Sequence, residues 1–215
     1  MIQFTSVHVL YLLEAAKWTI ALSLIALIGG AVLGLALALA RVSRVTMLRL
    51  AAAGYIQVIQ GTPLLIVLFL AYFGLNIVGY RLDALVAAGL SLTLFAGAFL
   101  GEIWRGCIEA VPRTQWEASD CLGLDQLQQY VYVILPQAMR IAIPPTVGFM
   151  VEAVKQTSLA SIIGFVELAR AGQIVNNATF QPFLVFALVG VIYFAICYPL
   201  TVASRRLEKR FHVAR

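Results

Sequence analysis

Charged side chains are scarce in this chain of 215 residues. They make up 12% of it, whereas hydrophobic residues make up 62% and the mean hydropathy is +0.94. Soluble domains carry about 25% charged residues. So few charges cannot cover a water-exposed surface, and the composition therefore indicates an integral membrane protein.

Signatures of several other classes are also missing. The three cysteines share no metal-ligand spacing, so we expect neither a disulfide framework nor a metal site. No nucleophile–base set lies at membrane depth, so we expect no catalytic residue, which disfavours an integral membrane enzyme. The sequence contains no G-x-x-x-x-G-K-[ST] phosphate loop. No cofactor of its own is expected. Basic residues do not alternate with stacking aromatics outside the apolar runs, which excludes nucleic acid as an expected partner.

Apolar stretches dominate what remains. A membrane-spanning helix needs about 20 mostly apolar residues, and five stretches reach or approach that length, at roughly 18–40, 55–78, 84–104, 138–164 and 182–203. The fourth is the weakest, because prolines and polar residues interrupt it. The sequence thus predicts an all-α membrane protein with about five transmembrane helices in one domain over residues 1–215.

Basic residues are concentrated in alternate loops, which predicts the orientation. Eleven of the 15 lysines and arginines fall on one side: Arg41, Arg44, Arg49, Arg105, Arg113, Arg140, Arg205, Arg206, Lys209, Arg210 and Arg215. Because short cytoplasmic loops carry the excess of Lys and Arg, the N-terminus is predicted outside and the C-terminus in the cytoplasm. Membrane lipid is then a partner by necessity, and the polar segment 112–136 lies in the cytoplasm.

The segment 112–136 has the signals of two short helices joined at Gly123. Thr114-x-x-Glu117 fits a capping box at the start of the first helix. Gly123 suits a left-handed residue just after its end. Asp125-x-x-Gln128 caps the second helix in a similar way, and Pro136 is expected to limit that helix. We therefore predict a preorganised helix–turn–helix.

This segment is much longer than a mere connection requires. Four large side chains are available for burial in it: Trp116, Leu122, Tyr130 and Val133. We interpret it as a docking site for a cytoplasmic partner. Glu117 then has two open roles. It either completes the cap, in which case glutamine would replace it almost silently, or it contacts the partner.

A long-spaced pattern runs through the same segment: Glu117-Ala118-Ser119, then Gly123, then Val133-Ile134-Leu135-Pro136. It resembles the EAA loop of ABC-importer permeases, which reads E-A-A, three residues, G, nine residues, I-x-L-P. Ser119 and Val133 are its two mild departures.

Further segments are similar to the polar amino acid branch of that family. Gly61-Thr62-Pro63-Leu64-Leu65 resembles R-G-T-P-L-L, with Gln60 where arginine is usual. Glu102-Ile103-Trp104-Arg105-Gly106 resembles E-I-x-R-G, and Lys155-Gln156-Thr157-Ser158-Leu159 resembles K-x-T-S-L.

The resemblance implies a type I ABC-importer permease fold in the bacterial inner membrane. Two permease subunits would form the pore, the second being another copy or a sister permease. Two ATPase subunits would bind ATP and Mg, and an extracytoplasmic binding protein would deliver a polar amino acid. By this resemblance the ATPase-coupling residues are Glu117, Ala118, Ser119, Gly123, Leu135 and Pro136.

Polar residues at membrane depth suggest a substrate pathway. Glu152 and Lys155 share a helix face at i, i+3, so they either form a mutual ion pair or help to line the route of an amino acid zwitterion. The candidate pathway residues are Gln60, Thr62, Glu152, Lys155, Gln156 and Thr157. The branch often has an uncharged residue at the position of Glu152, so the resemblance implies no role for this residue. We hypothesise separately that Glu152 helps a cationic or amide-bearing substrate to pass.

Two glycine pairs, Gly30 with Gly34 and Gly97 with Gly101, allow helices to approach closely. We expect packing within the chain, with dimerisation as the alternative. At the level of function, the alternative is a stand-alone secondary transporter or channel for small polar solutes. That class predicts internal repeats, which are not evident, and it leaves the segment 112–136 unexplained.

Overall fold

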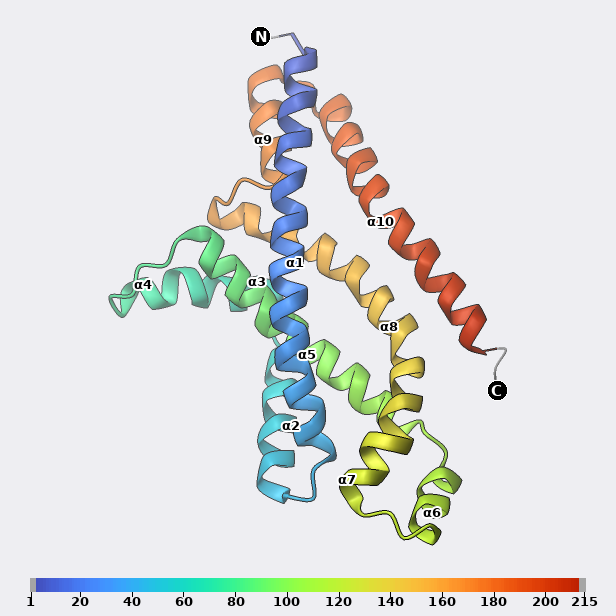
Figure 1. Cartoon of the computed structure of the whole chain (residues 1–215). Coiled ribbons are helices and arrows are strands. Elements are labelled where there is room, and N and C mark those ends of the chain that lie inside the picture. The colour runs from blue at the N-terminus through green and yellow to red at the C-terminus, as the bar shows by residue number, and fades with distance from the viewer. Residues whose placement is uncertain (1–2, 213–215) are drawn as a thin grey trace.

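The computed structural model describes residues 3–212, which form helices and connecting segments without a β-strand (Figure 1). Four of the described helices are long and apolar enough to cross a membrane, and a sharply bent helix pair provides a fifth candidate span. The predicted all-α membrane protein with about five spans is confirmed. Arg215, which entered the orientation argument, lies outside the described residues.

Three of the long helices run well past the predicted stretches. The helix α1 (Ser6–Val42) begins twelve residues before position 18, and α5 (Ala84–Glu109) and α10 (Pro182–His212) end beyond positions 104 and 203. With 37 residues, α1 is about 55 Å long, whereas the hydrocarbon core is about 30 Å thick. Hydropathy marks the part of a helix that suits lipid and not its polar ends, which explains the difference.

The second stretch does not run straight. Helix α2 (Thr46–Gly61) ends before Pro63, and a second helical segment, α3 (Leu64–Phe69) with a π turn and α4 (Leu75–Ile77), leaves at an angle of 100° to it. Pro63 has no N–H to continue α2, and Thr62 and Pro63 form the break. The predicted span over 55–78 is therefore a broken pair, visible in Figure 1 where α4 projects sideways from the direction of α2.

The fourth stretch is part of a longer continuous helix. It combines α7 (Gln126–Gln128), a π segment (Gln129–Ile134), α8 (Leu135–Gln156) and a 3-10 turn (Thr157–Ile163). Pro144 and Pro145 lie inside α8 without ending it.

One helix was not predicted at all. Helix α9 (Leu168–Thr179) lies between the fourth and fifth spans and is too short to cross a membrane. Its apolar residues Leu168, Ala171 and Val175 recur at helical spacing and are buried against α1 and α10. That spacing of apolar residues is the sequence signal that could have predicted α9.

The closest helix crossing joins α1 to α5 and depends on the glycine pairs. A Cβ atom added to Gly34 would lie 3.0 Å from the backbone N of Gly101 and 3.1 Å from the carbonyl O of Gly97. Gly30 sits equally close to Ala96 and Gly97. The expected packing within the chain is confirmed.

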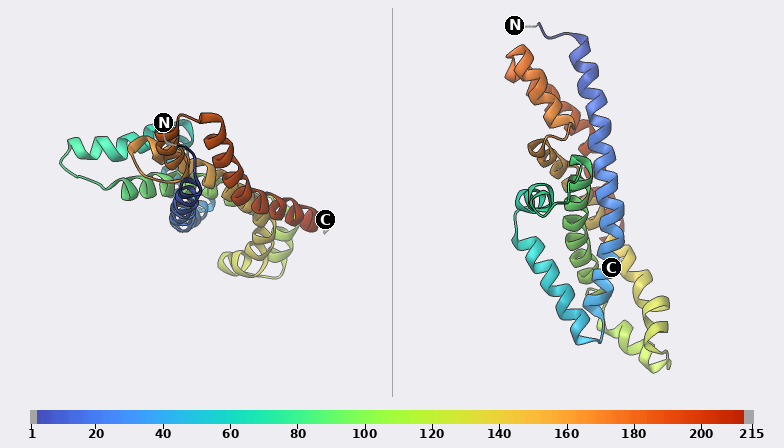
Figure 2. Two further views of the ribbon diagram at one scale, coloured as in Figure 1. Left: turned by 90° about the horizontal axis from the view of Figure 1, so that it is seen from above. Right: turned by 90° about the vertical axis from the view of Figure 1, so that its left-hand side faces the viewer.

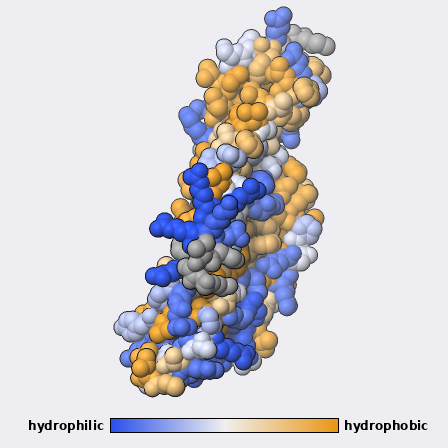
Figure 3. Space-filling model, turned by 90° about the vertical axis from the view of Figure 1, so that its right-hand side faces the viewer, coloured by the Kyte–Doolittle hydropathy of each residue, from blue (hydrophilic) through white to orange (hydrophobic). Residues whose placement is uncertain are grey.

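The molecule is elongated along α1 (Figure 2). The start of α1 and helix α9 lie at one end, and α6 (Arg113–Cys121) and α7 lie at the other (Figure 1). On one long face, hydrophobic residues dominate the upper part and hydrophilic residues gather in the middle and towards the α6–α7 end (Figure 3). This division matches a membrane-embedded body with a polar end.

Candidate functional site

The turn after α6 is closed by Gly123. Its φ of +71° lies in the left-handed region, its N–H donates to the carbonyl of Asp120 at 2.9 Å, and the N–H of Leu124 donates to the carbonyl of Ser119 at 3.2 Å. This pair of bonds is the Schellman arrangement, which satisfies the last carbonyls of a helix. The predicted role of Gly123 at the end of the first helix is confirmed.

The second helix of the loop is capped as predicted. The Asp125 carboxylate accepts from the N–H of Gln128, and the Gln128 side chain accepts from the N–H of Asp125, both at 2.9 Å. The side chain of Gln129 donates to the Asp120 carboxylate and so links the two helices. The turn is thus fixed by hydrogen bonds from both sides.

The predicted cap at Thr114 is wrong. Helix α6 begins at Arg113, with Pro112 as the residue before it, so Thr114 already lies within the first turn. Proline suits the start of a helix because its missing N–H needs no partner there. Glu117 is consequently an exposed residue of the second turn and not a member of a capping box.

The expectation that Pro136 limits the second helix is also wrong. The helix passes through Pro136 into α8. In a regular α-helix the proline ring would clash with the carbonyl four residues earlier. The π segment Gln129–Ile134 widens the turn before the proline and relieves that clash.

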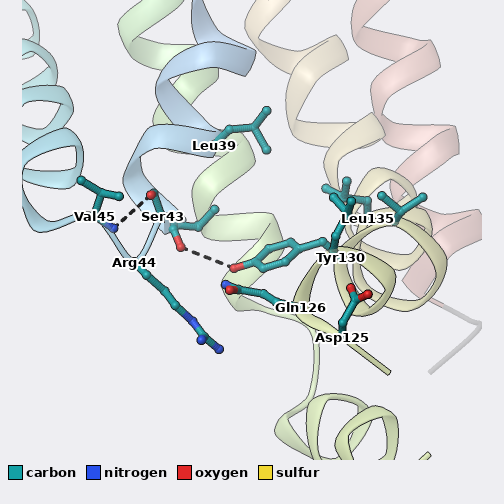
Figure 4. A pocket seen from close by; sticks show the side chains of 11 residues that line it. Leu39, Ser43, Arg44, Val45, Asp125, Gln126, Tyr130 and Leu135 are labelled. Atoms are coloured by element: carbon teal, nitrogen blue, oxygen red, sulfur yellow. Dashed lines mark hydrogen bonds between the residues drawn. The ribbon is translucent and has the colours of Figure 1, made fainter. Parts of the chain in front are cut away.

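The segment 112–136, called the coupling loop after the family that it resembles, packs onto the ends of α1 and α5. Ile108, Val111 and Ile134 are at most 5% exposed and form a cluster with Trp116 and Tyr130 around them. The Trp116 and Tyr130 rings meet edge to face, with centroids 5.2 Å apart. The Tyr130 hydroxyl also donates to the carbonyl of Val42 at the end of α1, at 3.4 Å (Figure 4). A displacement of the loop would therefore act directly on three spans.

The outer side of the coupling loop is left uncovered. Glu117, Ala118 and Pro136 are exposed, and Leu135 is partly buried. Leu122 is 77% exposed and Leu127 72%. Leu122, one of the four side chains available for burial, lies at the turn, away from the Ile108 cluster. Two exposed leucines at the tip of a capped loop leave an apolar surface for another protein.

Ser119 differs from the rest of α6 in being buried. It is 1% exposed, and its hydroxyl donates to the carbonyl of Trp116 at 2.7 Å. The position tolerates serine in place of alanine because the hydroxyl finds a partner within its own helix.

A charge cluster lies just inside the coupling loop. Glu102 and Arg105 form an ion pair within α5, and Arg105 also bonds the Glu109 carboxylate. The Arg41 Nε atom on α1 lies 3.9 Å from the Glu102 carboxylate. The cluster joins the ends of α1 and α5 that face the loop.

Gln60 and Thr62 lie at the break between α2 and α3. Gln60 is exposed, and the Thr62 hydroxyl donates to the carbonyl of Val58 at 2.7 Å. Helix α3 contacts the 3-10 turn Thr157–Ile163, so the two groups of candidate pathway residues come from neighbouring elements. Within residues 3–212, no hydrogen bond or salt bridge joins Gln60 or Thr62 to residues 152–157.

Glu152 is bonded to Gln156 and not to Lys155. The Glu152 carboxylate accepts from the Gln156 side chain at 2.6 Å, and among the described residues no salt bridge connects Glu152 to Lys155. The mutual ion pair is therefore not present here. Glu152 and Lys155 are both exposed in the single chain, whereas Thr157 is fully buried and donates to the carbonyl of Val154. An acid, a base and an amide thus share one stretch of α8.

Sequence analysis missed a buried carboxylate, Glu167. It is 0% exposed, accepts from the N–H groups of Ala169 and Arg170, and accepts from the Tyr193 hydroxyl at 2.7 Å. Thr19 on α1 contributes a hydroxyl at 3.4 Å and also accepts from the N–H of Leu168. This network holds α9 to α1 and α10. Its sequence signal was a glutamate directly before a short amphipathic helix.

The chain matches the family model described as "Binding-protein-dependent transport system inner membrane component" over residues 30–213. It belongs to this family. Among curated relatives, it is 35% identical to the "Probable amino-acid ABC transporter permease protein YckA" of Bacillus subtilis, with 94% of this chain and 89% of that protein covered. It is 34% identical to the glutamine transport system permease protein GlnP of Escherichia coli K12, with 94% and 93% covered.

Solved structures of this permease family have the same fold. A structure described as an amino acid ABC transporter with histidines matches with a TM-score of 0.91 and 31% identity, covering 98% of this chain and 99% of that one. An inward-facing structure of the MetNI methionine ABC transporter matches with a TM-score of 0.76 at 23% identity, which supports the fold alone. The expected type I importer permease fold is confirmed.

Proposed function

We propose that this chain is the permease subunit of an ATP-driven importer that moves a polar amino acid across the bacterial inner membrane. The observation that carries the proposal is the coupling loop. It is fixed by a Schellman turn and a capping box, it packs onto the ends of α1 and α5 and continues into α8, and it leaves Glu117, Leu122 and Leu127 exposed. Membership in the binding-protein-dependent transport family supports the same conclusion.

The loop is suited to transmit movement. A rigid element seated on a moving domain passes on a rigid-body displacement, whereas a floppy linker would absorb it. Here the π segment makes the second helix of the loop continuous with α8, so any rotation of the loop acts on α8 without a hinge between them. The arrangement supports coupling residues Glu117, Ala118, Ser119, Gly123, Leu135 and Pro136.

The partners follow from what the chain does not carry. With no phosphate loop in its sequence, ATP and Mg would be bound by two separate ATPase subunits seated on the coupling loops. A second permease, either another copy or a sister chain, would complete the pore, and an extracytoplasmic binding protein would deliver the substrate. The positive-inside distribution supports a multi-pass subunit with the coupling loop in the cytoplasm and the N-terminus outside.

The substrate route we propose passes the polar stretch of α8 and the break between α2 and α3. Lys155 offers a positive charge to a carboxylate, and Glu152 with Gln156 offers acceptors to an ammonium or amide group. Gln60 and Thr62 border the neighbouring break. Relatives named for glutamine support an amide-bearing amino acid as the substrate class.

The test is a mild-detergent pull-down of the tagged chain from its native membrane, followed by mass spectrometry. A Cβ atom at Gly123 would meet no atom within 4 Å, so Gly123→Val acts through the strained backbone of the turn alone. Gly54→Val is the matched control, because Gly54 also has open space but lies in the regular helix α2.

We expect a P-loop ATPase to be recovered with the unmodified chain and with Gly54→Val, and to be lost with Gly123→Val in a chain that still inserts. Recovery of the chain alone, under conditions that preserve a known importer, would replace the proposal with a self-sufficient transporter.

A further inference from the structure

A continuous groove runs between α1 and the helix formed by α7 and α8, at the end of the molecule that carries the coupling loop. It consists of two adjoining cavities of about 750 and 500 Å³ that share Leu135. Leu39 and Val42 line the outer cavity, and Leu35 and Ala38 line the inner one, so one face of α1 forms a wall of both. The loop 112–136 forms one wall of the groove, but the existence of the groove does not depend on the coupling role proposed above.

The inner cavity is apolar. Its walls come from α1, α5 and α8, with Met139, Ile143 and Val147 on the α8 side. Its polar side chains satisfy each other, because the Trp104 indole N–H donates to the Thr146 hydroxyl at 2.9 Å and that hydroxyl donates to the carbonyl of Ala142. The cavity therefore offers dispersion contacts and no hydrogen-bonding group to an occupant.

The outer cavity has a charged rim. Arg44 extends from the turn after α1, across the mouth from Asp125 (Figure 4). Arg44 is exposed, and within residues 3–212 it enters no salt bridge and no side-chain hydrogen bond. The Asp125 carboxylate is engaged by the N–H of Gln128. Arg44 is therefore the basic group available to an anionic ligand at this mouth, and the negative charge of Asp125 lies across from it.

Along α1 the groove covers about two thirds of one leaflet of the bilayer core. From Val42 at the end of α1 to Leu35 is a helical rise of about 10 Å, against about 15 Å for half the hydrocarbon core. The inner cavity is open to the surroundings, since Leu35 is 50% exposed and Met139 66%. An arginine at the rim of an apolar slot between transmembrane helices, on the predicted cytoplasmic side, can bind the phosphate of an anionic headgroup.

We propose that this groove binds one anionic phospholipid of the surrounding bilayer. The phosphate lies at Arg44, and an acyl chain lies between α1 and α8 along Leu35, Leu39 and Met139. A lipid so placed contacts both the coupling loop, through Leu127 and Tyr130, and α1. The lipid composition of the membrane would then influence how firmly the loop is held against α1.

The test uses the assembled importer in nanodiscs that contain either phosphatidylglycerol or phosphatidylcholine with a photoactivatable diazirine on the acyl chain, at equal low mole fraction. Mass spectrometry then locates crosslinked residues on this chain. Arg44→Ala removes the charge at the rim, and Arg49→Ala is the matched control, because Arg49 is exposed nearby on α2 but does not border the groove.

We expect residues 35–39 and 139–147 to be labelled about fivefold more by phosphatidylglycerol than by phosphatidylcholine, the factor that one basic residue near a membrane surface contributes. Arg44→Ala should remove this preference, and Arg49→Ala should retain it. Equal labelling by both lipids would show that the groove contacts lipid without preference for an anionic headgroup, and it would overturn the proposal. Absence of labelling would overturn it too, by showing that another protein chain covers the groove. So would a preference that survives Arg44→Ala.

Discussion

The exposed carboxylate of Glu117 does not stabilise the helix that carries it. Helix α6 begins without any contribution from Glu117, and the side chain lies on its uncovered side. Surface substitutions of this kind change the free energy of unfolding by at most about 0.5 kcal/mol. We expect Glu117→Gln to leave the thermal midpoint of the purified protein unchanged and to lower ATP-driven uptake in proteoliposomes several-fold.

The reason for the second effect is that a hydrogen bond to a charged group contributes about 1.5–3 kcal/mol at a contact. Glu208→Gln, on the exposed end of α10, is the control and should change neither quantity. Unchanged uptake with Glu117→Gln would remove this residue from the contact with the ATPase.

Glu152 permits a second experiment at the same scale. In Glu152→Gln an amide oxygen can still accept from the Gln156 side chain, so the local structure should persist. The negative charge is lost, and we expect uptake of a cationic amino acid to fall about tenfold relative to a neutral one. Competition between labelled arginine and labelled glutamine measures this ratio. If uptake and preference both stay as they were, the pathway role of Glu152 should be abandoned.

Among the elements, the crossing of α1 and α5 has the least room for change. Any side chain at Gly34 would press on the backbone of Gly97 and Gly101, which cannot rotate aside as a side chain would. Overpacking of this kind costs about 1–3 kcal/mol. We expect Gly34→Val to lower the thermal midpoint and the yield of monodisperse protein in size-exclusion chromatography, with Gly54→Val unaffected. A Gly34→Val protein as stable as the original would show that the two helices separate easily.

The coupling loop shows what a sequence reveals about an element and what it does not. The turn at Gly123 and the cap at Asp125 were predictable, because each depends on residues within five positions of one another. The passage through Pro136 was not, since a π segment has no pattern that distinguishes it from an α-helix. The cap at Thr114 failed because Pro112 offered an equally good start two residues earlier.

At the scale of the whole molecule, the native cysteines can report orientation. Cys121 at the end of α6 is exposed, whereas Cys107 and Cys197 are buried. We expect a membrane-impermeant maleimide to label Cys121 in inverted membrane vesicles and not in intact cells. Ser6 begins α1, at the end of the molecule opposite Cys121. In a protein that lacks Cys121, we expect the maleimide to label Ser6→Cys in intact cells and not in inverted vesicles. Labelling of Cys121 from outside would contradict the predicted orientation.

The global arrangement was only partly predictable. Hydropathy gave the number of spans, and the glycine pairs gave the crossing of α1 and α5. The 100° break after Gly61 could be suspected from Gly61 and Pro63, but its angle depends on how α3 packs against α5. The hydrogen-bond network around Glu167 could not be predicted from the sequence, since its partner Thr19 is 148 residues away and no local pattern connects them.

That network also has a consequence for how the protein is made. Thr19 enters the membrane with the first helix, but Glu167 is added only 148 residues later. At the usual pace of about 5–20 residues per second, the ribosome needs about 7–30 s to reach it. The Tyr193 hydroxyl, which bonds the same carboxylate, arrives later still. During this interval α1 stands in the bilayer without its last neighbours, and the nascent chain is most open to the insertion and quality-control machinery of the cell.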